Sequence, residues 1–133
     1  MIIKSFELNK IDIQKYNYFL LYGENQGHKN EVIEKKFKKF YSENIYNYEE
    51  SEILSNVAGF FNSVLSKSFF EDKKLVIISR ATDKINDLIE EIIEKNIQDI
   101  VFVLNANTLE KKSKLRSFFE KNKKTTCIPF YED

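Results

Sequence analysis

The stretch that decides the fold is YFLLYGENQGHKNEVIEKKFKK, residues 18–39. It opens with an apolar and aromatic run, Tyr18–Tyr22, of the kind that fills a buried strand. A polar turn with a glycine at each end follows at Gly23–Gly27, and a helical pattern begins directly after it. A strand, a glycine turn and a helix in this order are the layout of a phosphate-binding loop.

This turn departs from a working phosphate-binding loop, which reads G-x-x-x-x-G-K-[ST] and uses the Lys for the outer phosphates and the hydroxyl for Mg²⁺. Here Gly23 and Gly27 are one residue too close, so the loop encloses less space. His28, Lys29 and Asn30 follow where Lys and a hydroxyl residue should stand. We interpret Gly23, Gly27, Lys29 and Asn30 as a degenerate phosphate loop that binds no nucleotide. Lys29 is then a solvated lysine, and no cofactor is predicted.

Length and composition indicate one soluble globular domain. The chain has 133 residues, 42% of them hydrophobic and 32% charged. No apolar run approaches the roughly 20 residues of a membrane span, and the N-terminus lacks the features of a signal peptide. We therefore expect a cytoplasmic protein with no membrane partner. The balance of 21 basic and 21 acidic residues argues against a domain that mainly grips nucleic-acid backbones.

The single cysteine and single histidine argue against a metal site. Cys127 excludes an internal disulfide and a cysteine zinc cluster, and its apolar surroundings predict a small core residue. His28 has no cysteine or second histidine near it in the sequence, so we interpret it as a surface residue.

Short β-branched or aromatic runs alternate with helical patterns along the rest of the chain. Strands are predicted at Phe19–Tyr22, Ile45–Tyr48, Leu75–Ser79, Ile100–Leu104 and Thr126–Phe130. Helices are predicted at His28–Tyr41, Ser51–Leu65, Asp83–Lys95 and Glu110–Lys121. This alternation predicts a three-layer α/β domain of the P-loop NTPase type, with a five-stranded, mainly parallel sheet.

Several local features refine this prediction. Ile33, Phe37, Phe40 and Tyr41 should share the buried face of the first helix. The last helix should be capped by Thr108 and the third by Asp83, while Pro129 suggests an edge position or the end of its strand.

The third predicted strand lacks the acidic residue that a nucleotide hydrolase of this layout uses for Mg²⁺ and water. It ends in Ser79, Arg80 and Ala81. A phospho-receiver domain also needs an aspartate at this point. Asn105 and Asn107 follow the fourth strand, where related ATPases sense the γ-phosphate, but without a nucleotide we expect them to shape the turn.

Phe69 and Phe70 are adjacent, and polar residues flank them on both sides. One face of the chain cannot easily bury both rings. Either one ring fills the edge of the core and the other is half-exposed, or the pair anchors a partner protein.

Three segments together resemble the delta subunit of the bacterial DNA polymerase III clamp loader. They are Tyr18–Glu24 (YFLLYGE), Ser68–Ile78 (SFFEDKKLVII) and Ile100–Asn105 (IVFVLN) with the lysine-rich LEKKSKL, residues 109–115. Each motif is weak alone, but their order and spacing make the match specific from Tyr18 onward.

The resemblance implies an AAA+-type fold without ATP binding or hydrolysis, within a DNA-directed DNA polymerase complex that replicates DNA. It implies that Phe69 and Phe70, preceded by Ser68, insert into the sliding clamp and help to open it. Family members more often have Leu at the first position, so Phe69 is a departure. The implied partners are the sliding clamp (beta subunit) and, for the full-length protein, the delta prime and gamma/tau subunits, with DNA reached through the loader.

The resemblance implies that residues 1–133 correspond to the N-terminal domain of that family, without its lid and helical collar. The apolar faces of the predicted elements suggest a complete core, so we expect the isolated domain to be monomeric. Two other hypotheses for the function stay open. In one, the chain is a small P-loop kinase or ATPase with an unusual loop. In the other, it is a nucleotide-free structural module with an unknown partner.

Overall fold

The computed structural model describes residues 1–10, 12–41, 44–64 and 73–131. Its centre is a parallel sheet in the order β2-β3-β4-β1-β5. The strands are β1 (Tyr18–Gly23), β2 (Ile45–Glu49), β3 (Lys74–Ser79), β4 (Ile100–Asn105) and β5 (Thr125–Phe130). The five predicted strands are confirmed to within one residue at each end.

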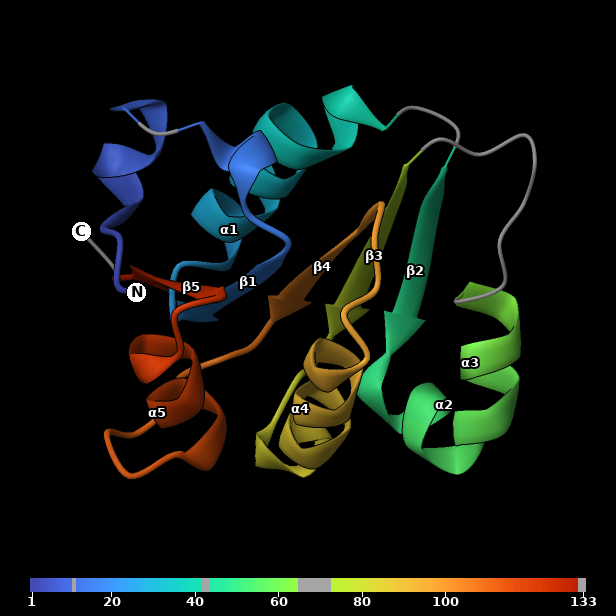
Figure 1. The fold of residues 1–133 in the computed structure, drawn as a ribbon. Coiled ribbons are helices and arrows are strands. Elements are labelled where there is room, and N and C mark those ends of the chain that lie inside the picture. The colour runs from blue at the N-terminus through green and yellow to red at the C-terminus, as the bar shows by residue number, and fades with distance from the viewer. Residues whose placement is uncertain (11, 42–43, 65–72, 132–133) are drawn as a thin grey trace.

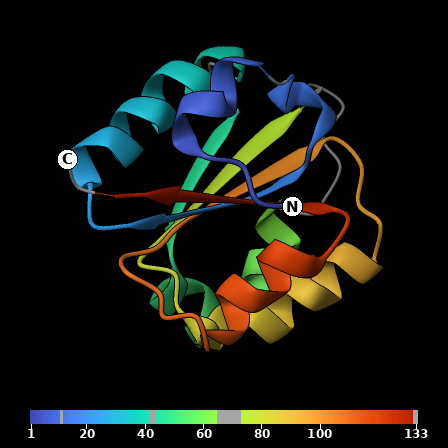
Figure 2. The ribbon, with the colours of Figure 1, turned by 90° about the vertical axis from the view of Figure 1, so that its left-hand side faces the viewer.

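Helices cover both faces of this sheet and make three layers (Figures 1 and 2). One face carries α2 (Glu50–Ser55), α3 (Val57–Val64), α4 (Asn86–Glu94) and α5 (Lys114–Lys121). The other carries α1 (Gln26–Val32), its π-helical continuation Ile33–Phe37, and the short 3₁₀ turns at Ser5–Lys10, Ile13–Lys15 and Lys38–Phe40. Each face of the sheet has its own apolar core, and alternate residues of β1 pack into one or the other. Leu20 packs on the α2–α5 side, and Phe19 and Leu21 pack on the α1 side.

The first helix begins earlier than predicted and changes its pitch. Asn25 caps it, because the Asn25 side chain accepts the His28 N–H at 3.0 Å. Ile33 and Phe37 are buried as predicted, but Phe40 is 47% exposed. The prediction for Phe40 is wrong because the π-helical turn holds more residues per turn than an α-helix and rotates the following residues off the buried face.

The second predicted helix is two helices that meet at Asn56. Its side chain accepts the Gly59 N–H at 3.0 Å and so starts α3 anew. The core face of α3 is supplied by Phe60 and Val64, with Val57 and Phe61 packed beside them.

Two predicted caps are wrong. The last helix begins at Lys114 and is capped by Ser113, whose hydroxyl accepts the Arg116 N–H at 3.2 Å. Thr108 lies outside the helix. The third helical segment starts with a 3₁₀ turn capped by Thr82, and the Asp83 carboxylate turns to the start of α5 instead. The buried face of α4, which includes Leu88, Ile89, Ile92 and Ile93, is as predicted.

The edge strand β5 contains Pro129, as predicted for a residue without an N–H. Met1 and Ile3 hydrogen-bond to Cys127 on the outer side of this strand. Cys127 is fully buried, as expected, and burial raises the pKa of its thiol to about 12. Across the described ranges, no helix has the length and apolar character needed to cross a membrane.

Candidate functional site

The degenerate phosphate loop lies at the carboxyl end of β1, between β4 and β5. The connection after β1 passes into α1 on one face of the sheet, and the connection after β4 passes into α5 on the other (Figure 1). A crevice forms where neighbouring parallel strands send their connections to opposite faces, and ligands of α/β sheets bind there. The crevice between β1 and β4 is therefore the place where a nucleotide phosphate would be expected.

The Lys29 side chain occupies this position. Its side chain is fully buried, and its ammonium group donates a hydrogen bond of 2.7 Å to the carbonyl oxygen of Ala106, just beyond β4. The prediction of a solvated lysine is wrong. Desolvation lowers the pKa of Lys29 from its ordinary value, because the charged form is disfavoured away from water.

Backbone N–H groups of the loop are also engaged within the chain. Those of Gln26 and Lys29 donate to carbonyl oxygens of Glu24 and Asn25 at 2.8 and 3.1 Å. The His28 N–H is held by the Asn25 side chain. In a working phosphate loop, such groups surround the phosphates. Here they stabilise the turn itself.

The two glycines of the loop have different surroundings. Gly23 has φ +127°, and a Cβ atom there would lie 1.9 Å from the carbonyl oxygen of Phe130. Gly23 therefore permits the close approach of β5. Gly27 is exposed, and the nearest atom that a Cβ would meet is Asn25 Oδ1 at 3.9 Å. Asn30 is exposed and its amide oxygen accepts a bond from the Gln26 side chain at 3.1 Å.

His28 is half-buried rather than wholly on the surface. Its ring meets the ring of Phe130 edge-on at a centroid distance of 4.9 Å. Within the described residues, no group of three His, Cys, Asp or Glu side chains could hold a metal ion.

Asn105, the last residue of β4, and Asn107, two residues later, bond to neighbouring segments through their backbone. The Asn107 carbonyl accepts the Gly23 N–H at 3.1 Å, and the Asn105 carbonyl accepts the Ala81 N–H at 3.1 Å. The first bond joins Asn107 to the last residue of β1, and the second joins the end of β4 to the loop after β3. Both use backbone carbonyls, so the turn-shaping role of the asparagine side chains stays a prediction.

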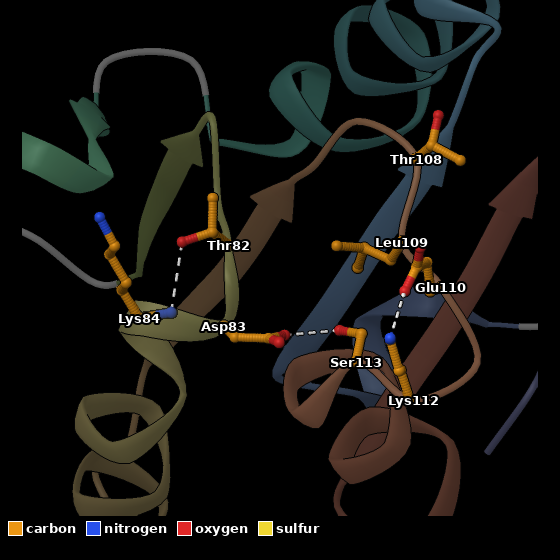
Figure 3. Close-up of a pocket in the computed structure, with 8 residues that line it drawn as sticks. All are labelled: Thr82, Asp83, Lys84, Thr108, Leu109, Glu110, Lys112 and Ser113. Carbon is orange, nitrogen blue, oxygen red and sulfur yellow. Dashed lines mark hydrogen bonds and ion pairs between the residues drawn. The ribbon is translucent and has the colours of Figure 1, made fainter.

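An open cleft of about 540 Å³ lies one strand further along, between the β3–α4 and β4–α5 loops (Figure 3). Asp83 and Ser113 point toward each other across it, and their side chains hydrogen-bond. The Ser113 hydroxyl and the Leu115 N–H both hold the pKa of Asp83 below its usual value. Because Asp83 accepts both the Ser113 hydroxyl and the Leu115 N–H, and the Ser113 hydroxyl caps α5, this contact orders the β3–α4 loop against the start of α5.

A buried carboxylate that the sequence did not indicate supports the same loop. Glu50, at the start of α2, accepts hydrogen bonds from the Thr82 N–H at 2.8 Å and the Thr82 hydroxyl at 2.7 Å. Glu50 is only 6% exposed. Its sequence context, a charged residue at a helix start, is indistinguishable from that of a solvated glutamate.

We expect Asp83→Asn to lower the free energy of unfolding by about 1–2 kcal/mol at neutral pH, because it weakens the bonds at the start of α5. The pKa of Asp83 is lowered from 3.8, so its carboxylate stabilises the fold above that pH and loses this effect as pH falls through the lower folded-state value. The difference between variant and parent should therefore shrink in acid. Urea unfolding from neutral to acidic pH measures it.

Asp87→Asn is the matched control for that measurement. Asp87, in α4, pairs with the Lys114 side chain at 2.8 Å and is 80% exposed. Asp83 is exposed as well, but it accepts the Leu115 backbone N–H at the start of α5. An exposed ion pair contributes little, so the control should stay within about 0.5 kcal/mol of the parent. If the Asp83→Asn effect is no larger than this, or does not change with pH, the Asp83 carboxylate does not stabilise the start of α5 as we describe.

The predicted clamp-binding residues Ser68, Phe69 and Phe70 lie outside the described residues, so their role stays a prediction. The described chain shows where their segment is attached. It leaves α3 after Val64 and enters β3 at Lys74, and the Lys74 ammonium donates to the Val64 carbonyl at 3.0 Å. This buried bond ties the two ends of the segment together.

Comparison with known proteins identifies a family and similar solved structures. The family model described as "DNA polymerase III, delta subunit" matches residues 19–129. The structure of the Bacillus subtilis DNA clamp loader delta protein (YqeN) superposes with a TM-score of 0.64 at 18% sequence identity, covering 96% of this chain. The chain spans 41% of the length of that protein. No curated protein sequence matches the chain.

Proposed function

Because this chain belongs to the DNA polymerase III delta-subunit family, we propose that it is a non-catalytic module that binds the sliding clamp and helps to open it during DNA replication. The family match over residues 19–129 carries the proposal. The similar B. subtilis structure supports the fold. The chain corresponds in this proposal to the N-terminal AAA+-like domain of a longer loader subunit.

The clamp-binding element in this proposal is Ser68, Phe69 and Phe70. Two observations from the described residues support it. The core face of α3 is already filled by Phe60 and Val64, so the fold has no evident need for further aromatic rings directly after this helix. The Lys74 ammonium donates to the Val64 carbonyl, so the chain leaves α3 and re-enters the fold at neighbouring points.

The proposal also names the remaining partners. Other loader subunits would contact the full-length protein, and DNA would be reached through the assembled loader rather than through this domain. The equal numbers of basic and acidic residues fit a domain whose main partner is a protein.

Direct binding to the sliding clamp of the same organism tests the proposal. We expect saturable binding of this chain to the clamp in surface plasmon resonance, with a dissociation constant in the micromolar range or tighter. The clamp at matched concentration should not bind an unrelated parallel α/β domain on the same surface. Absence of saturable clamp binding would refute the proposed function.

We further expect no binding of Mg-ATP at millimolar concentration in isothermal calorimetry. Lys29 occupies the crevice, and several backbone N–H groups of the loop are bonded within the chain. The loop also offers Asn30 where a hydroxyl would bind Mg²⁺. Saturable heat at micromolar nucleotide would instead favour a small P-loop enzyme.

A further inference from the structure

The crevice between β1 and β4 has an occupant that belongs to the chain itself. We infer that this crevice is an ammonium-binding site that the Lys29 side chain occupies. We infer further that the Lys29 ammonium group holds the β1–α1 loop against the end of β4. This inference goes beyond the proposed function, because it concerns how the domain keeps its shape and does not depend on clamp binding.

Three hydrogen bonds join the same two segments. The Ala106 N–H donates to the Leu21 carbonyl at 2.8 Å, and the Gly23 N–H donates to the Asn107 carbonyl at 3.1 Å. The Lys29 ammonium adds the third, to the Ala106 carbonyl at 2.7 Å. The first two bonds come from the strand and its last residue. The third comes from α1, so it adds a polar contact between this helix and the end of β4, beside the apolar cluster that contains Val32 and Val103.

The polarity of the crevice favours a cation over an anion. Its acceptor is the Ala106 carbonyl oxygen, which is the negative end of a peptide dipole. A phosphate in the same position would meet this oxygen and would have to displace the buried ammonium. The N–H groups of Gln26, His28 and Lys29, which could otherwise receive an anion, are bonded within the turn.

The burial of Lys29 explains why its ammonium group requires the Ala106 carbonyl as a hydrogen-bond acceptor. An ammonium group that leaves water without a partner is strongly disfavoured, and a fully buried lysine persists only when its charge is hydrogen-bonded. Conversely, removal of the ammonium leaves the Ala106 carbonyl without the bond that it receives from Lys29. The two groups therefore stabilise each other across 77 positions of sequence.

The consequence is a nucleotide-independent arrangement of the two loops. In a working P-loop domain, the crevice is filled or empty according to the nucleotide present. Here the occupant is covalently part of α1, so its effective concentration is fixed and the loops keep one arrangement.

Vacating the crevice tests the inference. Lys29→Ala removes the side chain beyond Cβ, which corresponds in length and charge to propylammonium. We expect propylammonium chloride to raise the urea midpoint of Lys29→Ala saturably. At a concentration of ten times its dissociation constant, it should raise the folded-to-unfolded ratio about 11-fold. The same concentration should leave the parent chain unchanged.

Lys35→Ala is the matched control. Lys35 belongs to the same helical segment, but its side chain is 71% exposed and forms an exposed pair with Glu31. We expect Lys35→Ala to unfold at nearly the parental urea concentration and to show no response to propylammonium beyond that of the parent.

Two further probes identify the chemistry of the vacated site. 1-Propanol has a similar length without the charge, and pyrophosphate represents the ligand of a working phosphate loop. Stabilisation of Lys29→Ala by propylammonium well above that by 1-propanol, with none by pyrophosphate, supports the ammonium site. Equal effects of propylammonium and 1-propanol, a larger effect of pyrophosphate, or no effect of any probe would overturn it.

A measurement on the parent chain keeps the inference testable if Lys29→Ala does not fold. The ammonium protons of Lys29 should exchange with water much more slowly than those of Lys35, and ¹⁵N-detected NMR of the lysine side chains reports both rates. If the Lys29 and Lys35 ammonium protons exchange equally fast, Lys29 does not hold the two segments together. Neither measurement involves the clamp, so failure here and failure of the proposed function are distinguishable.

Discussion

Replacement of both Phe69 and Phe70 by Ala is expected to weaken binding to the sliding clamp by about 10²- to 10⁴-fold and to leave the thermal midpoint unchanged. Each Phe side chain buried in a partner pocket contributes roughly 1.5–3 kcal/mol, so loss of both removes about 3–6 kcal/mol. The midpoint should not move, because the described part of α3 fills its core contacts with Phe60 and Val64.

The alternative hypothesis, in which Phe69 and Phe70 belong to the core, predicts a different result in the same experiment. Each core Phe→Ala change would lower the free energy of unfolding by about 3–5 kcal/mol. Thermal unfolding and clamp binding, measured on one preparation, therefore separate the two readings. A large drop in the midpoint, or clamp affinity equal to that of the parent, would refute the docking role.

A matched control comes from two phenylalanines that are exposed in the described part of the chain. Phe6 is 70% exposed and Phe40 is 47% exposed, and both lie on the α1 side of the sheet, away from α3. The double change Phe6→Ala/Phe40→Ala removes the same number of phenylalanine side chains from the chain. We expect it to leave clamp affinity within about twofold of the parent, since surface contacts outside a hot spot contribute little.

The second large effect is expected at Gly23. Gly23→Ala should lower the free energy of unfolding by about 2–6 kcal/mol, which combines backbone strain at φ +127° with a steric clash against β5. The added Cβ would lie 1.9 Å from the Phe130 carbonyl oxygen, so the two strands must separate. Urea denaturation of the purified variant measures the loss.

Gly27→Ala provides the control within the same loop. Gly27 has no unusual φ, and its Cβ would meet no atom closer than 3.9 Å. Alanine there should raise the free energy of unfolding by about 0.4–1 kcal/mol, because it restricts the unfolded chain. If Gly23→Ala were as stable as the parent, Gly23 would not be required by the strand packing that we describe.

The Gly23 result would also bear on how the loop is interpreted. In a functional phosphate loop, glycines let the backbone approach the ligand. In this chain, the backbone that approaches Gly23 is β5 itself. A glycine at the expected place therefore does not by itself indicate a nucleotide site.

The sequence alone determined the sheet, the layering and the family resemblance. The strands were recognisable because short β-branched and aromatic runs are local patterns, and the buried face of α4 was recognisable from its helical period. The family was recognisable from the order and spacing of three segments, and the family match over residues 19–129 confirms it.

The sequence offers more than one capping residue for these helices and does not show which of them begins the helix. Asn56 interrupts an otherwise continuous helical pattern because its side chain caps α3, and Ser113 rather than Thr108 caps α5. Both alternatives contain good capping residues. The choice is made by the neighbouring elements: Asp83, from the loop after β3, binds the Ser113 hydroxyl and so favours that start of the helix.

Only the tertiary structure decided the state of the crevice. Lys29 is one of many lysines in polar sequence, and its period and neighbours predict exposure. It is buried because the carbonyl of Ala106, 77 residues later, lies within hydrogen-bonding distance once β1 and β4 are adjacent. Glu50 is buried for the same reason, since its partner Thr82 lies 32 residues away. A charged side chain can be buried only where the fold supplies a partner, and that partner is not encoded in the local sequence.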